Sequence, residues 1–200
     1  MKLLKTSQSD FQAQFDELLE RGKMDIDNVT GIVNGIIDEI KLDGNTALRA
    51  PITKFDRWKP QSDEALEIDV ASMKKAYDAL DEDLKDALIL AFNRIKKYHE
   101  KQMPQSWMTY EDNGNVLGQK VTPVERAGLY IPGGKAAYPS SLLMNAIPAI
   151  VAGVEEIIVC TPAPDNELNH LLLAAMHLCG ITKAYKVGGA SAIAAMAYGT

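Results

Sequence analysis

The chain has 200 residues, of which 46% are hydrophobic and 24% charged, with a formal net charge of -6 and an isoelectric point near 5.1. These proportions are typical of a globular chain that can bury one sizeable core, and they argue against a disordered or fibrous protein. The acidic balance, without any run of clustered lysine and arginine, argues against nucleic acid or an anionic membrane surface as the main partner.

Targeting and redox signals are sparse. Residues 1–15 start with basic residues but contain only two consecutive apolar ones, so they lack the apolar core of a secretory signal. No stretch approaches the roughly 18 uninterrupted apolar residues that would span a bilayer. Cys160 and Cys179 lie in apolar segments that look buried, and they form no Cys-x-x-Cys pattern for zinc or redox chemistry. We therefore expect a cytoplasmic protein in a reducing compartment, without membrane contact.

Helical periodicity dominates the first hundred residues. Apolar residues recur at spacings of three and four, which predicts amphipathic helices. The expected helical ranges are 10–20, 25–41, 46–55 with an interruption at Pro51, and 69–98 as two helices broken near Asp81. The polar segment 58–67, which contains Pro60, is interpreted as a connection. Residues 1–104 are therefore expected to form a helical N-terminal module that needs something to pack against.

The pattern changes at about residue 105, where two short segments flank Asn113-Gly114, a pair typical of a β-hairpin turn. Strands and helices then alternate, and this order predicts a parallel sheet with right-handed crossovers. Strands are expected at 127–131, 157–161 and 184–187, and helices at 140–154, 168–178 and 190–197. Doubly wound sheets usually have more than three strands. We therefore expect residues 105–200 to form a hairpin plus an incomplete Rossmann-like α/β domain that is truncated at its C-terminus.

Two glycine-rich turns are the strongest candidates for a binding site. Gly133-Gly134 follows the first parallel strand, and Gly188-Gly189 follows the third; each pair precedes a helix. Paired glycines allow a ligand to approach the backbone, and the N-terminus of a helix attracts phosphate. Two such turns at one sheet edge suit a ligand with two phosphates. Neither turn matches the Gly-x-Gly-x-x-Gly fingerprint, and a tight turn without a ligand stays open as an alternative.

The residues around these turns resemble a known family. The segment Glu-Arg-Ala-Gly-Leu-Tyr-Ile-Pro-Gly-Gly at 125–134, followed by Tyr-Pro-Ser-Ser at 138–141 and Leu-Met-Asn-Ala-Ile-Pro-Ala at 143–149, resembles histidinol dehydrogenase. The segment 187–200, which contains Val-Gly-Gly-Ala and Ala-Tyr-Gly-Thr, resembles the next block of that family, in order. The resemblance is close over residues 125–200 and looser over the first hundred residues.

This resemblance implies an aldehyde-dehydrogenase-like fold and an enzyme that oxidises L-histidinol to L-histidine. It implies two NAD molecules used in turn, one zinc ion that positions the substrate, and a homodimer. It also implies that Tyr130 lies against NAD and that Pro132, Gly133 and Gly134 belong to the same loop. Ser191 stands where the family has a glutamine that contacts NAD, and its shorter hydroxyl could bond through water.

The family's zinc ligands and its catalytic glutamate and histidine correspond to positions after residue 200. No catalytic or metal-binding residue is therefore assigned in this chain, and the chain alone is expected to be inactive. Two other hypotheses stay open. One is a non-catalytic dimerisation fragment, favoured by helices whose isoleucine and valine faces lack a partner. The other is a related dehydrogenase of another amino alcohol or a sulfonate.

Overall fold

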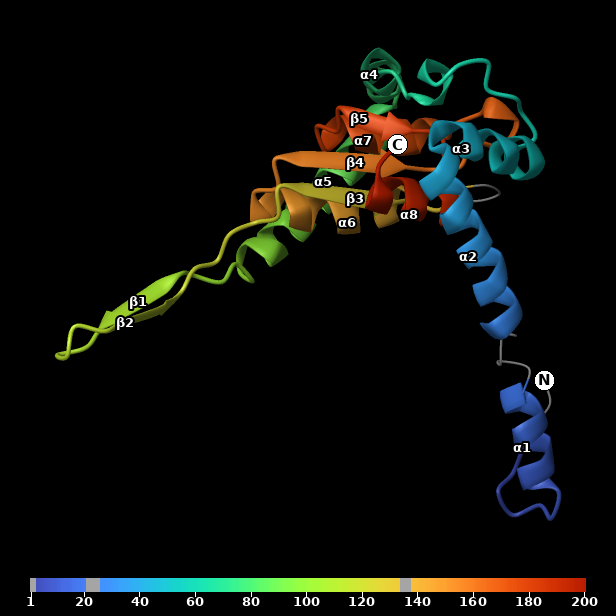
Figure 1. Cartoon of the computed structure of the whole chain (residues 1–200), viewed down its shortest axis with the longest axis horizontal. Coiled ribbons are helices and arrows are strands. Elements are labelled where there is room, and N and C mark those ends of the chain that lie inside the picture. The colour runs from blue at the N-terminus through green and yellow to red at the C-terminus, as the bar shows by residue number, and fades with distance from the viewer. Residues whose placement is uncertain (1–2, 21–25, 134–137) are drawn as a thin grey trace.

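The chain has an α/β fold in a computed structural model that describes residues 3–20, 26–133 and 138–200 (Figure 1). Within these ranges the main sheet is parallel, with strand order β3-β4-β5. Its strands are β3 (Arg126–Tyr130), β4 (Glu156–Cys160) and β5 (Lys183–Tyr185). Each overlaps a strand expected from the sequence, so the predicted parallel sheet is confirmed. Glu156, at the start of β4, forms ion pairs with Arg126 at the start of β3 and with Lys183 at the start of β5.

Helices cover both faces of the sheet. One face carries α6 (Pro139–Ala152) and α7 (His170–Leu178), with α4 (Val70–Asp78) and α5 (Glu82–Glu100) packed outside them. The other face carries α8 (Gly189–Tyr198), α2 (Ile26–Asp43) and α3 (Asn45–Pro51). Successive side chains of a strand point to opposite faces. Val159 accordingly lies in the hydrophobic cluster with α6 and α7, and Cys160 lies in the cluster with α8. The sheet therefore separates two cores.

The helices expected in the first hundred residues are present. α1 (Phe11–Glu20), α2, α4 and α5 match their predicted ranges closely. In the third expected range, 46–55, α3 ends at Pro51, the residue at which an interruption was expected because proline lacks an N–H group, and Ile52–Asp56 continues as a π-helix. Both hydrophobic clusters join these helices to the sheet. The division of the chain at residue 104 stays a prediction.

The segment interpreted as a connection also completes the sheet edge. It contains a 3-10 turn, Glu64–Leu66, after which Glu67 forms an antiparallel bridge with Tyr185. The Lys186 N–H donates to the Leu66 carbonyl at 2.7 Å, and the Ile68 N–H donates to the Ala184 carbonyl at 2.8 Å. These bonds satisfy backbone groups that an uncovered edge strand would leave unpaired.

A single carboxylate sets the start of α5. Asp81 has an extended backbone, and its side chain accepts a hydrogen bond from the Leu84 N–H at 2.8 Å. We expect Asp81→Ala to lower the free energy of unfolding by about 1 kcal/mol, because an N-terminal N–H of the helix loses its partner. Asp81→Asn keeps an acceptor and should stay near wild type in urea denaturation. Equal losses in both variants would contradict this role.

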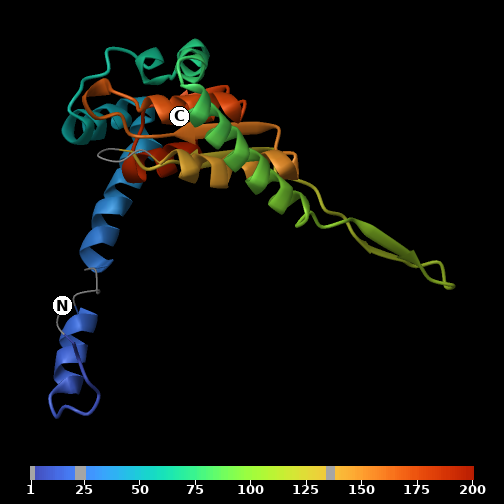
Figure 2. The same cartoon turned by 180° about the vertical axis from the view of Figure 1, so that it is seen from behind.

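The β-hairpin is also confirmed. It consists of β1 (Trp107–Tyr110) and β2 (Val116–Gln119), paired antiparallel, and the turn between them contains Gly114 at a φ of 89°. All eight strand residues are exposed, and both views show the hairpin extending away from the sheet and its helices (Figures 1 and 2). Among the residues that the structure describes, no helix is long and apolar enough to cross a membrane.

Both cysteines are buried, as the sequence suggested, and neither forms a disulfide. Burial raises the pKa of the Cys160 thiol to about 11 and that of the Cys179 thiol to about 12. Because the thiolate is the reactive form, we expect almost no reaction of the native chain with an aromatic disulfide reagent at pH 8. Both thiols should react within minutes in denaturant. Rapid reaction of either thiol in the folded chain would contradict the burial seen here.

Candidate functional site

The loops after β3, β4 and β5 meet at the carboxyl edge of the parallel sheet. Pro162, in the loop after β4, contacts the other two loops. A Cβ atom at Gly133, in the loop after β3, would lie 2.8 Å from the Pro162 carbonyl oxygen. A Cβ atom at Gly188, in the loop after β5, would lie 2.6 Å from Pro162 Cβ. Both separations are too short for nonbonded atoms. The two glycine turns can therefore rest on Pro162 only because they lack side chains there.

Tyr130 connects the same two turns. It ends β3 and packs against the hydrophobic cluster beneath α8. Its phenol oxygen accepts a hydrogen bond from the Gly189 N–H at 3.2 Å. Gly189 has a φ of 63°, a backbone conformation that suits glycine. The end of the first strand is thus bonded directly to the start of the helix that follows the third.

A pocket of about 320 Å³ lies where these turns meet the helical segment 51–56. Its sheet-side wall is lined by Gly133, Pro162, Gly188, Gly189 and Ser191. The N-cap residue of α8, Gly188, has no side chain that could cap the helix, and the Gly189 N–H is bonded to Tyr130; this helix N-terminus forms part of the wall. Free N–H groups and the positive end of the helix dipole favour an anion here. The wall therefore suits a phosphate group.

The predicted site residues differ in how they relate to this pocket. Gly133 and Ser191 line it, and Ser191 is 3% exposed. Tyr130 does not line it but bonds to Gly189, which does. Pro132 is exposed and lies outside the lining, and Gly134 falls outside the described residues. The assignment of these five residues to a cofactor stays a prediction.

Asp56 is a polar residue of the pocket that the sequence gave no reason to expect. It is 6% exposed, and its Oδ2 accepts a hydrogen bond from the Ala163 N–H at 3.3 Å. Burial raises the pKa of the Asp56 carboxyl, while the bond from Ala163 and the charge of Arg57 act in the opposite direction. Asp56 and Ala163 are 107 residues apart, and no local pattern marks such a pair.

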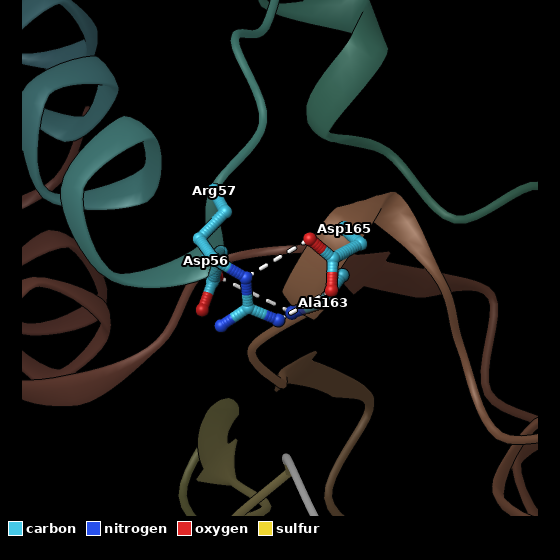
Figure 3. Close-up of polar contacts among 4 residues, drawn as sticks. All are labelled: Asp56, Arg57, Ala163 and Asp165. Atoms are coloured by element: carbon cyan, nitrogen blue, oxygen red, sulfur yellow. Dashed lines mark hydrogen bonds and ion pairs between the residues drawn. The ribbon is translucent and has the colours of Figure 1, made fainter.

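Arg57, the residue after Asp56, also contacts the loop after β4. The guanidinium of Arg57 pairs with both carboxylate oxygens of Asp165, with Nε to Oδ1 at 3.0 Å (Figure 3). That hydrogen bond holds the pKa of Asp165 below its usual value. Both residues have left-handed backbones, with φ of 59° at Arg57 and 57° at Asp165. The end of the π-helix is thus attached to the loop after β4 at two neighbouring points.

Two other hollows are larger, and the first of them is lined by three cationic side chains, Arg49, Lys54 and Lys59. One of about 450 Å³ lies on the surface formed by residues 49–60, and one of about 490 Å³ lies between α8 and the sheet. Neither is lined by a predicted site residue among those the structure describes. In the same parts of the chain, no group of three His, Cys, Asp or Glu side chains could hold a metal ion. The described residues therefore do not fit a zinc site.

Comparisons with known proteins agree with one another. The sequence model of one family, described as histidinol dehydrogenase, matches residues 19–200. The chain is 64% identical over 200 residues to a histidinol dehydrogenase of Wolinella succinogenes, and 67% identical over 192 residues to one of Sulfurimonas denitrificans. It covers 46% and 45% of those proteins, so it spans about half the length of these curated relatives.

A solved structure shows the same likeness in three dimensions. The crystal structure of histidinol dehydrogenase from Elizabethkingia anophelis superposes with a TM-score of 0.79 at 31% sequence identity. The match covers 89% of this chain and 40% of that one. The α/β fold expected from the sequence is therefore confirmed by an independent structure.

Proposed function

Because this chain belongs to the histidinol dehydrogenase family, we propose that it is part of an enzyme that oxidises L-histidinol to L-histidine in histidine biosynthesis. Within that enzyme, this chain binds NAD at the pocket formed by the two glycine turns. NAD, when bound, accepts a hydride from the substrate. The residues described here bind and orient the cofactor, and no proton transfer is assigned to them.

The observation that carries this proposal is the convergence of both glycine turns and the N-terminus of α8 on one pocket. Gly189 has open space where a side chain would begin, and the first turn of α8 offers the N–H groups after Gly189 to a phosphate oxygen. A pocket of about 320 Å³ is at the small end of the range for ligand sites, which fits a diphosphate portion better than a whole dinucleotide.

The zinc ion and the homodimer that the family resemblance implies remain proposals for the longer protein. The exposed apolar side chains of the hairpin favour a second candidate, a non-catalytic interaction segment; they include Trp107, Met108, Tyr110, Val116 and Leu117. Light scattering after size exclusion would test it, because a monomer at high concentration contradicts self-association through the hairpin.

Calorimetric titration of this chain with NAD tests the cofactor proposal. We expect saturable binding, weakened at least about tenfold by Tyr130→Ala, because the second glycine turn loses the support of the ring and of the hydroxyl. Tyr130→Phe removes only the hydroxyl that accepts from Gly189 and should have a smaller effect. Tyr98, which is 62% exposed on α5, provides a matched control as Tyr98→Phe. A cooperatively folded chain that gives no binding heat at millimolar NAD would contradict the proposal.

A further inference from the structure

The loop after β4 determines how the two glycine turns are placed relative to each other. Gly133 and Gly188 both contact Pro162, from opposite loops, at distances that leave no room for a side chain. Pro162 has no backbone N–H and cannot be held by donating a hydrogen bond. Its position is therefore set by its neighbours in the loop, which are Thr161, whose N–H donates to the Tyr185 carbonyl at 3.0 Å, and the residues that follow, Ala163 to Asp165.

Asp56 holds the first of these residues. The Ala163 N–H is buried, and its partner is the Oδ2 atom of a side chain that is only 6% exposed. Hydrogen bonds to ionised groups are stronger than those between neutral groups, and burial reduces their screening by salt. Without Asp56 this N–H would stay buried without an acceptor. The bond is thus a buried attachment between the π-helix and the β4 loop.

Arg57 holds the second attachment, which is weaker. Its side chain and that of Asp165 are 60% and 57% exposed, and ion pairs at such positions add little to stability. Both residues nevertheless have a left-handed backbone, which aspartate tolerates and which is unfavourable for arginine. The two-oxygen contact favours these conformations and so fixes the direction of the loop (Figure 3).

We propose that Asp56, assisted by Arg57, is a positioning residue for the pocket. By holding Ala163 and Asp165 it fixes Pro162, and Pro162 sets the separation between the glycine turns of Gly133 and Gly188. The consequence for NAD affinity rests on the proposed function; the consequence for loop placement does not. Asp56 acts through the loop and is not assigned a contact with the cofactor.

The test compares Asp56→Ala with Asp56→Asn in the full chain, without ligand and with NAD. Amide hydrogen exchange at Gly189 is the decisive reading, because Gly189 donates to Tyr130 and has no hydrogen bond with Asp56. We expect Asp56→Ala to accelerate exchange at Gly189 about tenfold relative to core amides of α7, and to raise the Kd for NAD by a similar factor. Asp56→Asn keeps an acceptor oxygen for Ala163 and should restore both values.

A second ion pair provides the matched control for Arg57. Arg49 pairs with Asp63 at 2.8 Å in the same helical region, with side chains 41% and 44% exposed, and neither residue lines the pocket. Arg57→Gln should accelerate exchange at Gly189, by less than Asp56→Ala, whereas Arg49→Gln should leave it unchanged. Uniform acceleration of all amides would show general destabilisation and overturn the inference.

The two proposals can fail separately. If the wild-type chain does not bind NAD but Gly189 responds to Asp56→Ala and is rescued by Asp56→Asn, the cofactor assignment fails and the positioning role stands. If NAD binds and both Gly189 exchange and the Kd are the same in Asp56→Ala as in wild type, the positioning role is wrong and the cofactor assignment stands.

Discussion

Met73→Ala is expected to lower the free energy of unfolding by about 2–5 kcal/mol, the usual cost of emptying a core position. Met73 lies on α4 with no exposed surface, in the hydrophobic cluster that joins α4 and α5 to α6, α7 and the sheet. Its removal leaves a cavity between α4 and α7, which pack directly against each other. Urea denaturation followed by circular dichroism would measure the loss.

The same substitution on the surface serves as the control. Met144 is 63% exposed on α6, and Met144→Ala should change the free energy of unfolding by no more than about 0.5 kcal/mol. If Met73→Ala were equally mild, α4 would not belong to the same cooperative unit as the sheet. A separate early transition for α4 and α5 would lead to the same conclusion and would support a division of the chain near residue 104.

Gly188→Ala is expected to destabilise the chain by about 1–3 kcal/mol, the usual cost of adding a methyl group to a packed site. The backbone φ at Gly188 is −117°, which suits any residue, so the effect comes from contact alone. The new Cβ would lie 2.6 Å from Pro162 Cβ and 3.3 Å from Pro162 Cα, atoms of a rigid ring that cannot turn away. Pro162 must therefore move, and we expect NAD binding to weaken together with stability.

Gly35→Ala makes the same chemical change where there is space. Gly35 lies in the middle of α2, and no atom outside its own helix backbone among the described residues is within 4 Å of a Cβ built there. Alanine favours helix by roughly 0.5–1 kcal/mol over glycine, so this variant should be slightly more stable than wild type. Thermal unfolding of both variants decides the matter; a neutral Gly188→Ala would mean that the turns do not rest on Pro162.

The sequence predicted the elements and failed mainly at their connections. Helix periodicity located α2, α4 and α5, and the Asn113-Gly114 turn located the hairpin, because these signals arise from neighbouring residues. Residues 58–67 are polar and contain Pro60, which predicts a connection. Only the folded chain shows that Glu67 pairs with Tyr185, because an isolated bridge leaves no repeat in the sequence.

For the candidate site, the sequence by itself determined the two glycine turns, which are visible as glycine pairs. It also determined that the strands before them are parallel, because strands and helices alternate along the chain, and parallel strands bring both turns to one edge of the sheet. It also identified the family. Only the tertiary structure placed Pro162 between the turns and brought Asp56 and Arg57 to the β4 loop, across separations of 107 and 108 residues. Such contacts depend on how helices pack on the sheet, and packing is decided by the shape of whole surfaces rather than by any motif.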